Sequence, residues 1–296
     1  MSFNVTRDRV HAYAAVVRQP TNELPTPDGS RDDVPLTYFM ATSWSDLVLA
    51  GTEELERRGV SGAPLTLVHY QLRATRPLVV GDAVATAIEI VGFASAPGGA
   101  FLTIRHDTYL SDGERLAEQR SVVLIQGLEH DERNRNVIPR PEVVRLDPLY
   151  HSLVHIESAY PQRFAEVSGD ENPIHLDRAA AITAGFSAVV VHGMGLLARC
   201  LESEAVRTVA ESWGHSSAHP IRAFEVSCQF GRPAHPGDVV NVRASPARLP
   251  PECPAVAFGA ATPRGAALKQ GLLVFDPVTS LRSDTRDISV PGSARA

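Results

Sequence analysis

Cysteine is scarce in this sequence, and the few that occur do not form pairs. The 296 residues contain three cysteines, at positions 200, 228 and 253, with no C-x-x-C spacing of the kind that holds zinc or performs thiol redox chemistry. An odd, scattered set of thiols is typical of a reducing compartment. Residues 1–9 also carry charge where a signal peptide needs an apolar stretch. The sequence therefore predicts a cytoplasmic location.

Long apolar runs and an excess of positive charge are missing as well. The run at residues 188–191 is among the longest and is far short of the roughly 20 apolar residues that span a bilayer, so no membrane span is expected. Lys and Arg number 28 against 34 Asp and Glu, a net charge of −6, which gives no positive field to hold a phosphate backbone. Nucleic acid is therefore not an expected partner.

One spaced pattern occurs twice, half a chain apart. Arg-Pro, three residues and Gly-Asp stand at residues 76–82 and again at 232–238. In both halves an alternating apolar run precedes the pattern, and strand, strand, turn, strand follow it. A stretch of helical apolar spacing comes before each set, at residues 43–58 and 193–212. One long helix with an antiparallel sheet, twice over, predicts an α+β fold.

The expected strands and domains follow from this repeat. Strands are expected at residues 65–72, 84–91, 100–104 and 122–125 in the first half, and at 221–230, 239–242, 255–258 and 272–275 in the second. Residues 126–148 are polar and proline-rich and read as a linker. The expected domains are therefore residues 1–148 and 149–285, followed by a flexible tail at 286–296.

The densest polar cluster in an apolar neighbourhood lies at residues 168–177. Its Ser-Gly-Asp-Glu-Asn-Pro sequence is typical of a turn, because Gly169 permits unusual φ values and Asp170 and Asn172 can bond their own backbone. Such a turn can direct Asp170 and His175, five residues apart, into one cleft. By shape alone, an Asx-turn with a surface histidine is the simpler interpretation.

A second cluster, at residues 184–195, places glycines between an apolar run and the start of a helix. The free N–H groups of such a helix favour a carbonyl oxygen placed against them, although a packing contact eased by glycine explains the pattern equally well. Residues 193–198 also have the form GxGxxA, which dinucleotide-binding folds use. That interpretation requires a second buried strand with an acidic residue about 20 positions on. Residues 201–219 read as helix and loop, so nicotinamide or flavin binding is disfavoured.

Metal binding and nucleophilic catalysis have less support. His151 and His155 are four residues apart, as are His215 and His219, but neither pair has a further ligand at a workable spacing. The chain lacks G-x-S-x-G, and none of its cysteines has a histidine beside it. No metal site is therefore expected.

Read in order, the two clusters resemble the MaoC-like family of (R)-specific enoyl-thioester hydratases and 3-hydroxyacyl-thioester dehydratases. The resemblance rests on Phe-Ala, Ser-Gly-Asp-x-Asn-Pro-Ile-His-x-Asp, Ala-Gly-Phe and Val-His-Gly-Met between residues 164 and 194. It implies a double hot-dog fold, in which each half wraps an antiparallel sheet around a long central helix. Both units of the pair would lie in one chain, as an internal pseudo-dimer. The implied enzyme class is a lyase, a hydro-lyase of acyl-thioester and fatty acid metabolism.

The resemblance also implies a mechanism. Asp170 and His175 would hold one water between them and exchange protons during reversible hydration of a trans-2-enoyl thioester to an (R)-3-hydroxyacyl thioester. Asn172 would orient the carboxylate or the water through its amide. The backbone N–H of Gly193 would bond the thioester carbonyl and stabilise the enolate. Either Asp170 or His175 could protonate carbon.

Further residues around these four are implied to bind substrate: Ser168, Pro173, Ile174, Phe186, His192 and Met194. Two interpretations of His192 stay open, a role in shaping its loop and simple packing. The resemblance implies no metal or redox cofactor, because the substrate itself carries coenzyme A or the phosphopantetheine of an acyl-carrier protein. The sequence leaves open which carrier is used, and whether the chain acts alone or as a homodimer.

The first half lacks the catalytic turn. Aligning residues 13–17 with residues 164–168 places Gln19 at the position of Asp170 and Leu24 at that of His175. Neither side chain can replace a carboxylate or an imidazole. The first half is therefore expected to be a degenerate domain that supplies stability and walls of the acyl-chain pocket, with one active site per chain.

Two other functions remain open. Hot-dog folds also serve thioesterases, in which Asp170 could activate a water that attacks the carbonyl. A protein that binds acyl thioesters without catalysis is the other, and it would be favoured if Asp170 and His175 point apart. The pairing of His175 with Asp170 favours hydration or dehydration over both.

Overall fold

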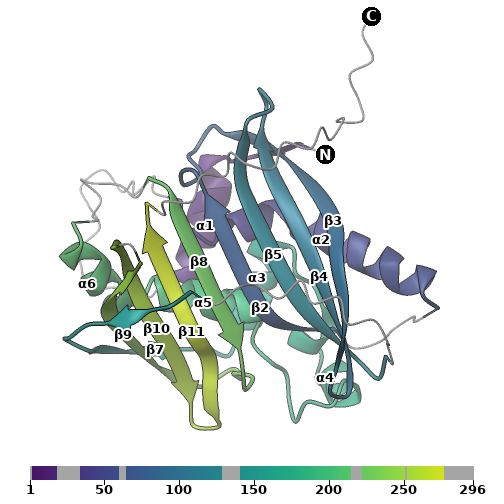
Figure 1. Cartoon of the computed structure of the whole chain (residues 1–296). Helices are drawn as coiled ribbons and strands as arrows, with labels where there is room; N and C mark the ends of the chain where they lie inside the picture. The colour runs from purple at the N-terminus through teal and green to yellow at the C-terminus, as the bar shows by residue number, and fades with distance from the viewer. Residues whose placement is uncertain are drawn as a thin grey trace, which may run out of the picture.

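The computed structural model describes residues 2–18, 34–59, 65–128, 141–214, 222–250 and 252–276. Within these residues the strands form one 11-stranded sheet, in the order β1-β3-β4-β5-β2-β8-β11-β10-β9-β6, with β7 also paired to β9. All the pairings are antiparallel. Helices α1, α2, α3 and α5 gather behind this sheet, which curves around them (Figure 1). No helix in the described ranges is long and apolar enough to cross a membrane.

Each half contributes its own run of strands to the sheet. The first half supplies β1 (Ser2–Asn4), β2 (Leu65–Ala74), β3 (Ala83–Ala96), β4 (Gly99–Leu110) and β5 (Arg115–Gln126). The second supplies β6 (Val144–Arg145), β7 (Tyr150–His155), β8 (Phe224–Phe230), β9 (Val239–Leu249), β10 (Cys253–Thr262) and β11 (Gly265–Phe275). The α+β class and the expected strands are confirmed. Several strands run longer than expected because partly polar segments continue the ladder beyond the apolar core.

The two halves join where β2 pairs with β8. Leu72 lies opposite Val226 in this pairing, and both side chains are fully buried. On the other face of the sheet, Gln71 and Arg73 donate to the carboxylate of Glu225 at 2.6 and 2.8 Å. A central strand pair of this kind gives both halves one continuous sheet and one shared core.

The repeated Arg-Pro-x₃-Gly-Asp pattern forms the same turn in each half. Asp82 accepts the backbone N–H of Val79 at 2.9 Å and is held by Arg76. Asp238 accepts the backbone N–H of His235 at 2.8 Å. The glycine before each aspartate has a positive φ, 103° for Gly81 and 89° for Gly237, which explains why the pattern needs glycine there. The repeat is therefore structural.

The helices that precede these turns are also equivalent. Val5, before α1 (Arg7–Val17), exchanges two backbone hydrogen bonds with the first turn, and Ile156, before α3 (Tyr160–Ser168), does so with the second. The two helices therefore occupy equivalent places in the two halves. This agrees with the alignment of residues 13–17 with residues 164–168, which compares the chain after α1 with the turn after α3. Gln19 and Leu24, which that alignment places opposite Asp170 and His175, lie outside the described residues.

The long helices differ from their expected bounds. The first begins earlier, as α2 (Tyr38–Arg57). The second is wrong as a single helix, because it is divided into α5 (Gly193–Leu201) and α6 (Glu204–Ser212). The break falls at Ser203: its backbone is extended, with ψ at 152°, and its hydroxyl donates to the Cys200 carbonyl at 2.6 Å. Serine competes in this way with helical hydrogen bonding.

The expected linker at 126–148 is wrong at its C-terminal end. Val144–Arg145 forms the short strand β6, which pairs with β9 at the edge of the sheet. A two-residue strand on an edge leaves almost no periodic signal in a sequence, because its side chains are exposed on both faces. Residues 129–140 of this segment, and the expected tail at 286–296, lie outside the described residues.

Candidate active site

The turn that follows α3 places Asp170. The helix ends at Gly169 in the left-handed conformation, with φ at 76°. The Asp170 carboxylate then accepts the backbone N–H of Asn172 at 3.2 Å, and the Asn172 side-chain oxygen accepts that of Ile174 at 3.3 Å. The expected bonding of these side chains to their own backbone is confirmed. Asn172 therefore contacts the carboxylate through its backbone N–H, while its amide oxygen caps the short helix η1 (Pro173–His175).

His175 ends η1 and faces the carboxylate. Its Nδ1 lies 2.8 Å from the Val190 carbonyl, and because a carbonyl only accepts, Nδ1 carries the hydrogen. Nε2 therefore presents its lone pair, 4.0 Å from Oδ2 of Asp170. Asp170 is 4% exposed and His175 is 8% exposed. The interpretation of His175 as a surface histidine is therefore wrong. The sequence alone does not reveal that the 184–192 segment folds back over this side chain.

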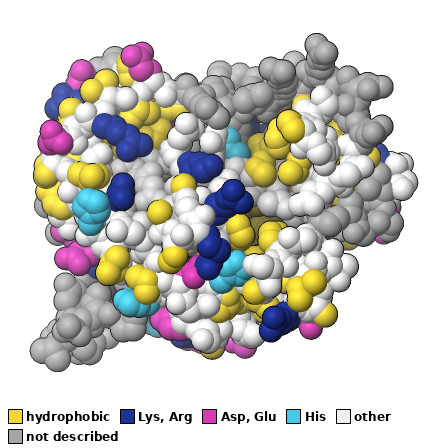
Figure 2. All heavy atoms as spheres, turned by 90° about the horizontal axis from the view of Figure 1, so that it is seen from below, with side chains coloured by type: hydrophobic (Ala, Val, Ile, Leu, Met, Phe, Trp, Pro, Cys, Tyr) yellow, Lys and Arg dark blue, Asp and Glu magenta, His cyan; other side chains and the backbone are white. Residues whose placement is uncertain are grey.

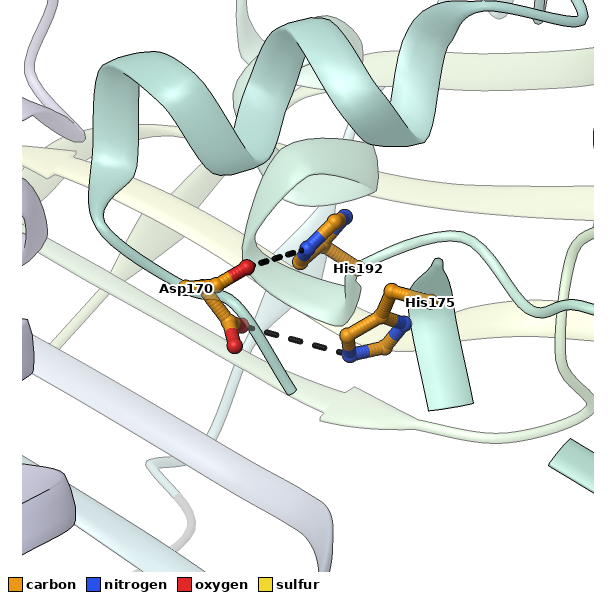
Figure 3. A group of neighbouring side chains, drawn as sticks. All are labelled: Asp170, His175 and His192. Atoms are coloured by element: carbon orange, nitrogen blue, oxygen red, sulfur yellow. Dashed lines mark hydrogen bonds and ion pairs between the residues drawn. The ribbon is translucent and has the colours of Figure 1, made fainter. Parts of the chain in front are cut away.

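His192 holds the other side of the turn (Figure 3). Its Nε2–H donates to the backbone carbonyl of Asp170 at 2.9 Å. Its ring stacks on His175 with centroids 3.9 Å apart and planes at 29°, and it packs against Phe164 at 5.0 Å. His192 is fully buried, and packing alone does not account for its hydrogen bond to the backbone of the candidate catalytic turn.

The segment between η1 and α5 is held by two imidazoles. His175 donates to the Val190 carbonyl, and His235 Nδ1 lies 2.7 Å from the preceding carbonyl, that of Val189. His235 stands in the second copy of the repeat, where its backbone N–H bonds Asp238. Sequence reasoning missed His235, although its place inside a repeated turn was a usable signal.

Gly193 begins α5 directly after His192. The first N–H groups of a helix have no partner within it and suit a developing negative charge. A Cβ on Gly193 would lie 3.1 Å from the Phe230 ring, so the absence of a side chain lets this ring pack against the helix start. The glycine is thus explained by a close packing contact, and it directly follows His192 of the Asp170 cluster.

The residues expected to bind substrate fall into two groups. Ser168 and Met194 are buried, and the Ser168 hydroxyl is already used within α3, donating to the Phe164 carbonyl at 2.7 Å. Ile174 and Phe186 are half-buried and Pro173 is exposed. The last three are therefore the more accessible to a ligand.

Burial dominates the electrostatics of the cluster. It raises the pKa of the Asp170 carboxyl to about 7, against the opposing effects of the Asn172 backbone N–H and the Trp44 indole. Burial lowers the pKa of His175 to about 4 and that of His192 to about 3. Both imidazoles are then neutral at neutral pH, and the carboxyl group is poised between its two forms. Perturbed titratable groups that cluster in this way mark candidate functional sites.

Trp44 comes from α2 in the first half, far from the motif in the sequence. Its indole lowers the pKa of the Asp170 carboxyl, against the effect of burial. Sequence reasoning missed it, and the motif gave no signal, because the contact depends on how α2 packs against the turn.

The cluster is poorly arranged for a metal ion. Asp170, His175 and His192 each have a possible ligand atom within 4.8 Å of the others. An imidazole binds a metal through a lone pair in its ring plane, and each of the two stacked rings has one nitrogen committed to a backbone carbonyl. For His192 that nitrogen is Nε2. The geometry suits exchange of protons between a carboxyl group and one imidazole.

Comparison with known proteins gives the same region a family. The model of the MaoC like domain matches residues 146–248. Peroxisomal multifunctional enzyme type 2 of Drosophila melanogaster is 25% identical over 149 residues, 49% of this chain and 23% of that protein. The 3-hydroxyacyl-thioester dehydratase X of Mycobacterium tuberculosis is 27% identical over 179 residues, 60% of this chain and 61% of that protein. The chain thus spans less than two thirds of either curated relative.

Solved structures agree on the fold. The MaoC-like dehydratase from Phytophthora capsici has a TM-score of 0.68 at 16% identity, covering 93% of each chain. A Mycobacterium tuberculosis protein described as having a double hot-dog fold has a TM-score of 0.56 at 14% identity, again covering 93% of each chain. The resemblance of residues 164–194 to the MaoC-like family is confirmed by the match of residues 146–248 to the MaoC like domain, and the chain has the double hot-dog fold.

Proposed function

We propose that this chain is a hydro-lyase that reversibly hydrates trans-2-enoyl thioesters to (R)-3-hydroxyacyl thioesters. The observation that carries the proposal is the buried gap of 4.0 Å between Nε2 of His175 and Oδ2 of Asp170. One water at about 2.8 Å from each atom would bridge this gap with an angle near 90° at its oxygen. The two groups would then act on the same water.

The protonation states favour one division of labour. Neutral His175 offers a lone pair at Nε2, because its Nδ1–H is committed to the Val190 carbonyl. In hydration, Nε2 takes a proton from the water as the water oxygen bonds Cβ. The π electrons of the double bond move toward the thioester carbonyl, and the protonated Asp170 carboxyl donates its proton to Cα. The Gly193 N–H stabilises the enolate oxygen. Dehydration runs through the same steps in reverse.

The raised pKa of Asp170 supports this assignment. An aspartate with an ordinary pKa would be fully ionised near neutral pH and unable to donate, whereas a pKa of about 7 leaves much of it protonated. The depressed pKa of His175 keeps the base neutral over the same range. The pair formed by Asp170 and His175, which we call the dyad, therefore carries one exchangeable proton, on Asp170, between about pH 4 and pH 7.

The chain itself would supply acid, base and oxyanion donor. No metal or redox cofactor is needed, and the ligand is an acyl group carried on coenzyme A or on acyl-carrier phosphopantetheine. The similarity to a protein named 3-hydroxyacyl-thioester dehydratase supports this substrate class. We assign catalysis to the expected domain at residues 149–285 and a supporting role to residues 1–148.

The test is an assay with crotonyl-CoA and a longer trans-2-enoyl-CoA. Loss of the enoyl-thioester absorbance without release of free thiol, giving the (R)-3-hydroxy product, is the expected result. Asp170→Asn and His175→Ala should each lower the rate by about 10²–10⁴-fold with unchanged circular dichroism. Release of thiol would identify a thioesterase instead, and binding of the thioester without turnover would indicate a binding protein.

A further inference from the structure

The repeated turn carries different side chains in the two halves at one position. The residue that donates its backbone N–H to the aspartate of the turn is Val79 in the first copy and His235 in the second. The Val79 side chain is 51% exposed, whereas His235 is 9% exposed. Because both copies make the same backbone hydrogen bond, the turn itself does not require a histidine. The imidazole therefore has a further use in the second half.

The imidazole of His235 contacts the segment that leads into α5. Residues 189–192 belong to neither a helix nor a strand, so no regular ladder of hydrogen bonds fixes their backbone. His235 Nδ1 lies 2.7 Å from the Val189 carbonyl, and because a carbonyl only accepts, this Nδ1 carries the hydrogen. The Val191 N–H donates to the Ala234 carbonyl at 2.8 Å. The second copy of the turn thus holds the segment at two points.

The residue between these two points, Val190, sets the state of His175. Its carbonyl accepts the Nδ1–H of His175 at 2.8 Å, and its own N–H donates to the Ile174 carbonyl at 3.3 Å. A neutral imidazole carries one hydrogen, and the acceptor beside the ring decides which nitrogen carries it. With the Val190 carbonyl in place, Nε2 keeps the lone pair that faces Asp170 across 4.0 Å. A displaced carbonyl would let the hydrogen move to Nε2, where it would block the base.

The backbone of His235 is itself anchored. Asp238 accepts its N–H at 2.8 Å and also pairs with Arg264, which lies between β10 and β11. In the first copy, by contrast, the carboxylate of Asp82 is held by Arg76 of the same turn. The aspartate of the second copy thus ties its turn to a neighbouring hairpin. The imidazole therefore reaches the Val189 carbonyl from a fixed backbone.

Resting on the proposed function, we propose that His235 is a positioning residue for the reaction: its imidazole holds the Val189–Val190 backbone so that the Val190 carbonyl keeps the hydrogen of His175 on Nδ1. His235 acts through this backbone and takes no part in the proton exchange. The turn that is structural in the first half thereby gains a role in the reaction in the second half.

Nitrogen NMR tests this proposal without substrate. In protein with ¹⁵N-labelled histidine at pH 7, the His175 signals can be assigned by their loss in His175→Ala. Burial keeps this imidazole neutral at that pH, so the parent should show a protonated Nδ1 and an unprotonated Nε2. In His235→Leu, a substantial part of His175 should carry its hydrogen on Nε2 instead. A His175 that keeps the parent pattern in His235→Leu would overturn the proposal.

A conservative variant should rescue the signal. The amide nitrogen of His235→Asn lies as many bonds from the backbone as Nδ1 and also donates, so this variant should keep the hydrogen of His175 on Nδ1. A His235→Asn protein with the pattern of His235→Leu would mean that the hydrogen bond to Val189 is not the cause. Because this readout needs no turnover, it decides the role of His235 even if the chain is not a hydratase.

The kinetic test measures kcat and KM separately with crotonyl-CoA. We expect His235→Leu to lower kcat on the order of tenfold with little change in KM, because fewer molecules present a free Nε2 on His175. His235→Asn should restore most of the rate. A raised KM with unchanged kcat in His235→Leu would place His235 in substrate binding and overturn the positioning role.

The first copy of the turn provides the matched control. Asp82→Ala removes the carboxylate that accepts the Val79 N–H, in the half that does not contain the 189–192 segment. Both Asp82→Ala and His235→Leu should lower the free energy of unfolding, but only His235→Leu should change kcat and the protonated nitrogen of His175. Equal losses of rate in the two variants would reduce His235 to packing and overturn the proposal.

Discussion

Asp170 is a carboxyl group at a place that penalises its charge. The residue is 4% exposed and its carboxylate accepts the Asn172 N–H, and among the described residues no cation is bonded to it. Burial therefore raises its pKa from the usual 3.8 to about 7. A side chain that costs stability when ionised is expected where function requires the charge to come and go. Burial of the carboxyl group is thus the origin both of the stability lost when Asp170 ionises and of the raised pKa on which the proposed chemistry depends.

We predict that Asp170→Asn stabilises the protein at alkaline pH while abolishing activity. The folded pKa lies above the unfolded one, so the aspartate's contribution to stability is complete below pH 3.8 and is lost as pH rises through 7. At pH 8 the variant should therefore unfold at a higher temperature than the parent, by an amount corresponding to a few kcal/mol, and the difference should shrink toward pH 4.

The measurement is thermal unfolding followed by circular dichroism at pH 4, 6 and 8. Asp177→Asn is the control, since Asp177 is exposed and caps α4 (Arg178–Thr183) by accepting the Ala180 N–H at 2.7 Å, a role that asparagine also fills. If the unfolding temperatures of the parent and of Asp170→Asn differ by the same amount at all three pH values, the buried carboxyl group is not the cause of the difference.

The same two pKa values predict a bell-shaped rate profile. If the working dyad carries one proton, kcat/KM should rise above about pH 4, where His175 loses its proton, and fall above about pH 7, where Asp170 ionises. Both directions of the reaction use the same total protonation, so both profiles should share these limbs. Initial rates with crotonyl-CoA and with its 3-hydroxy product check this. A rate that keeps rising from pH 6 to 9 would contradict a protonated Asp170.

At the scale of elements, the start of α5 is packed without room for side chains. A Cβ on Gly195 would lie 3.0 Å from the Tyr160 hydroxyl and 3.1 Å from the Phe164 ring. Phe164 in turn packs against His192. We predict that Gly195→Ala lowers the free energy of unfolding by about 1–3 kcal/mol and lowers activity, because Phe164 must shift against the candidate site.

Gly51→Ala provides the matched comparison for Gly195→Ala. Gly51 also lies within a helix, but its Cβ would meet only the Ile104 side chain, at 3.8 Å. Replacing glycine in a helix without a clash should stabilise the protein by roughly 0.5–1 kcal/mol. Urea unfolding of the two variants measures both effects. Equal destabilisation would mean that loss of glycine itself, and not the contact with Phe164 and Tyr160, determines the outcome.

The elements also show what the sequence could reveal. The turn at Asp170 was predictable because its hydrogen bonds join residues two apart, so they are written into the local sequence. The break between α5 and α6 was not, because the apolar positions Leu201 and Val209 are buried on either side of it and keep the i, i+8 spacing of one helix face across it. The break itself is a local change in the backbone of Ser203, whose ψ is 152°. Trp44 was out of reach for another reason, since only the packed fold brings α2 against the Asp170 turn. His235 had a usable signal in the repeated turn, but its contact with the Val189 carbonyl also depends on the packed fold.

At the scale of the whole molecule, Arg199 binds the halves behind the sheet. This arginine of α5 is 1% exposed. It donates to the Val16 carbonyl of α1 at 3.0 Å and to the His155 carbonyl at 3.1 Å, and it pairs with Glu157 at 2.8 Å. A buried guanidinium is tolerated only with its donors satisfied. Arg199 thus joins α1 of the first half to α5 of the second, on the helical side of the sheet that the β2–β8 pairing makes continuous.

One shared core implies one unfolding transition, and the two tryptophans can test this. Trp44 lies in the first half and Trp213 in the second, so Trp213→Phe and Trp44→Phe each leave an indole that reports on one half.

Leu72→Ala removes a buried side chain opposite Val226 at the junction and should lower the free energy of unfolding by about 2–5 kcal/mol. In urea, the emission midpoints of the two single-tryptophan proteins should each fall when Leu72→Ala is added. The shifts should be equal, because the main core cluster draws its residues from both halves. A shift confined to the Trp44 signal would instead show that the halves unfold separately, and the packing of α2 against the Asp170 turn would then be a contact between independent domains.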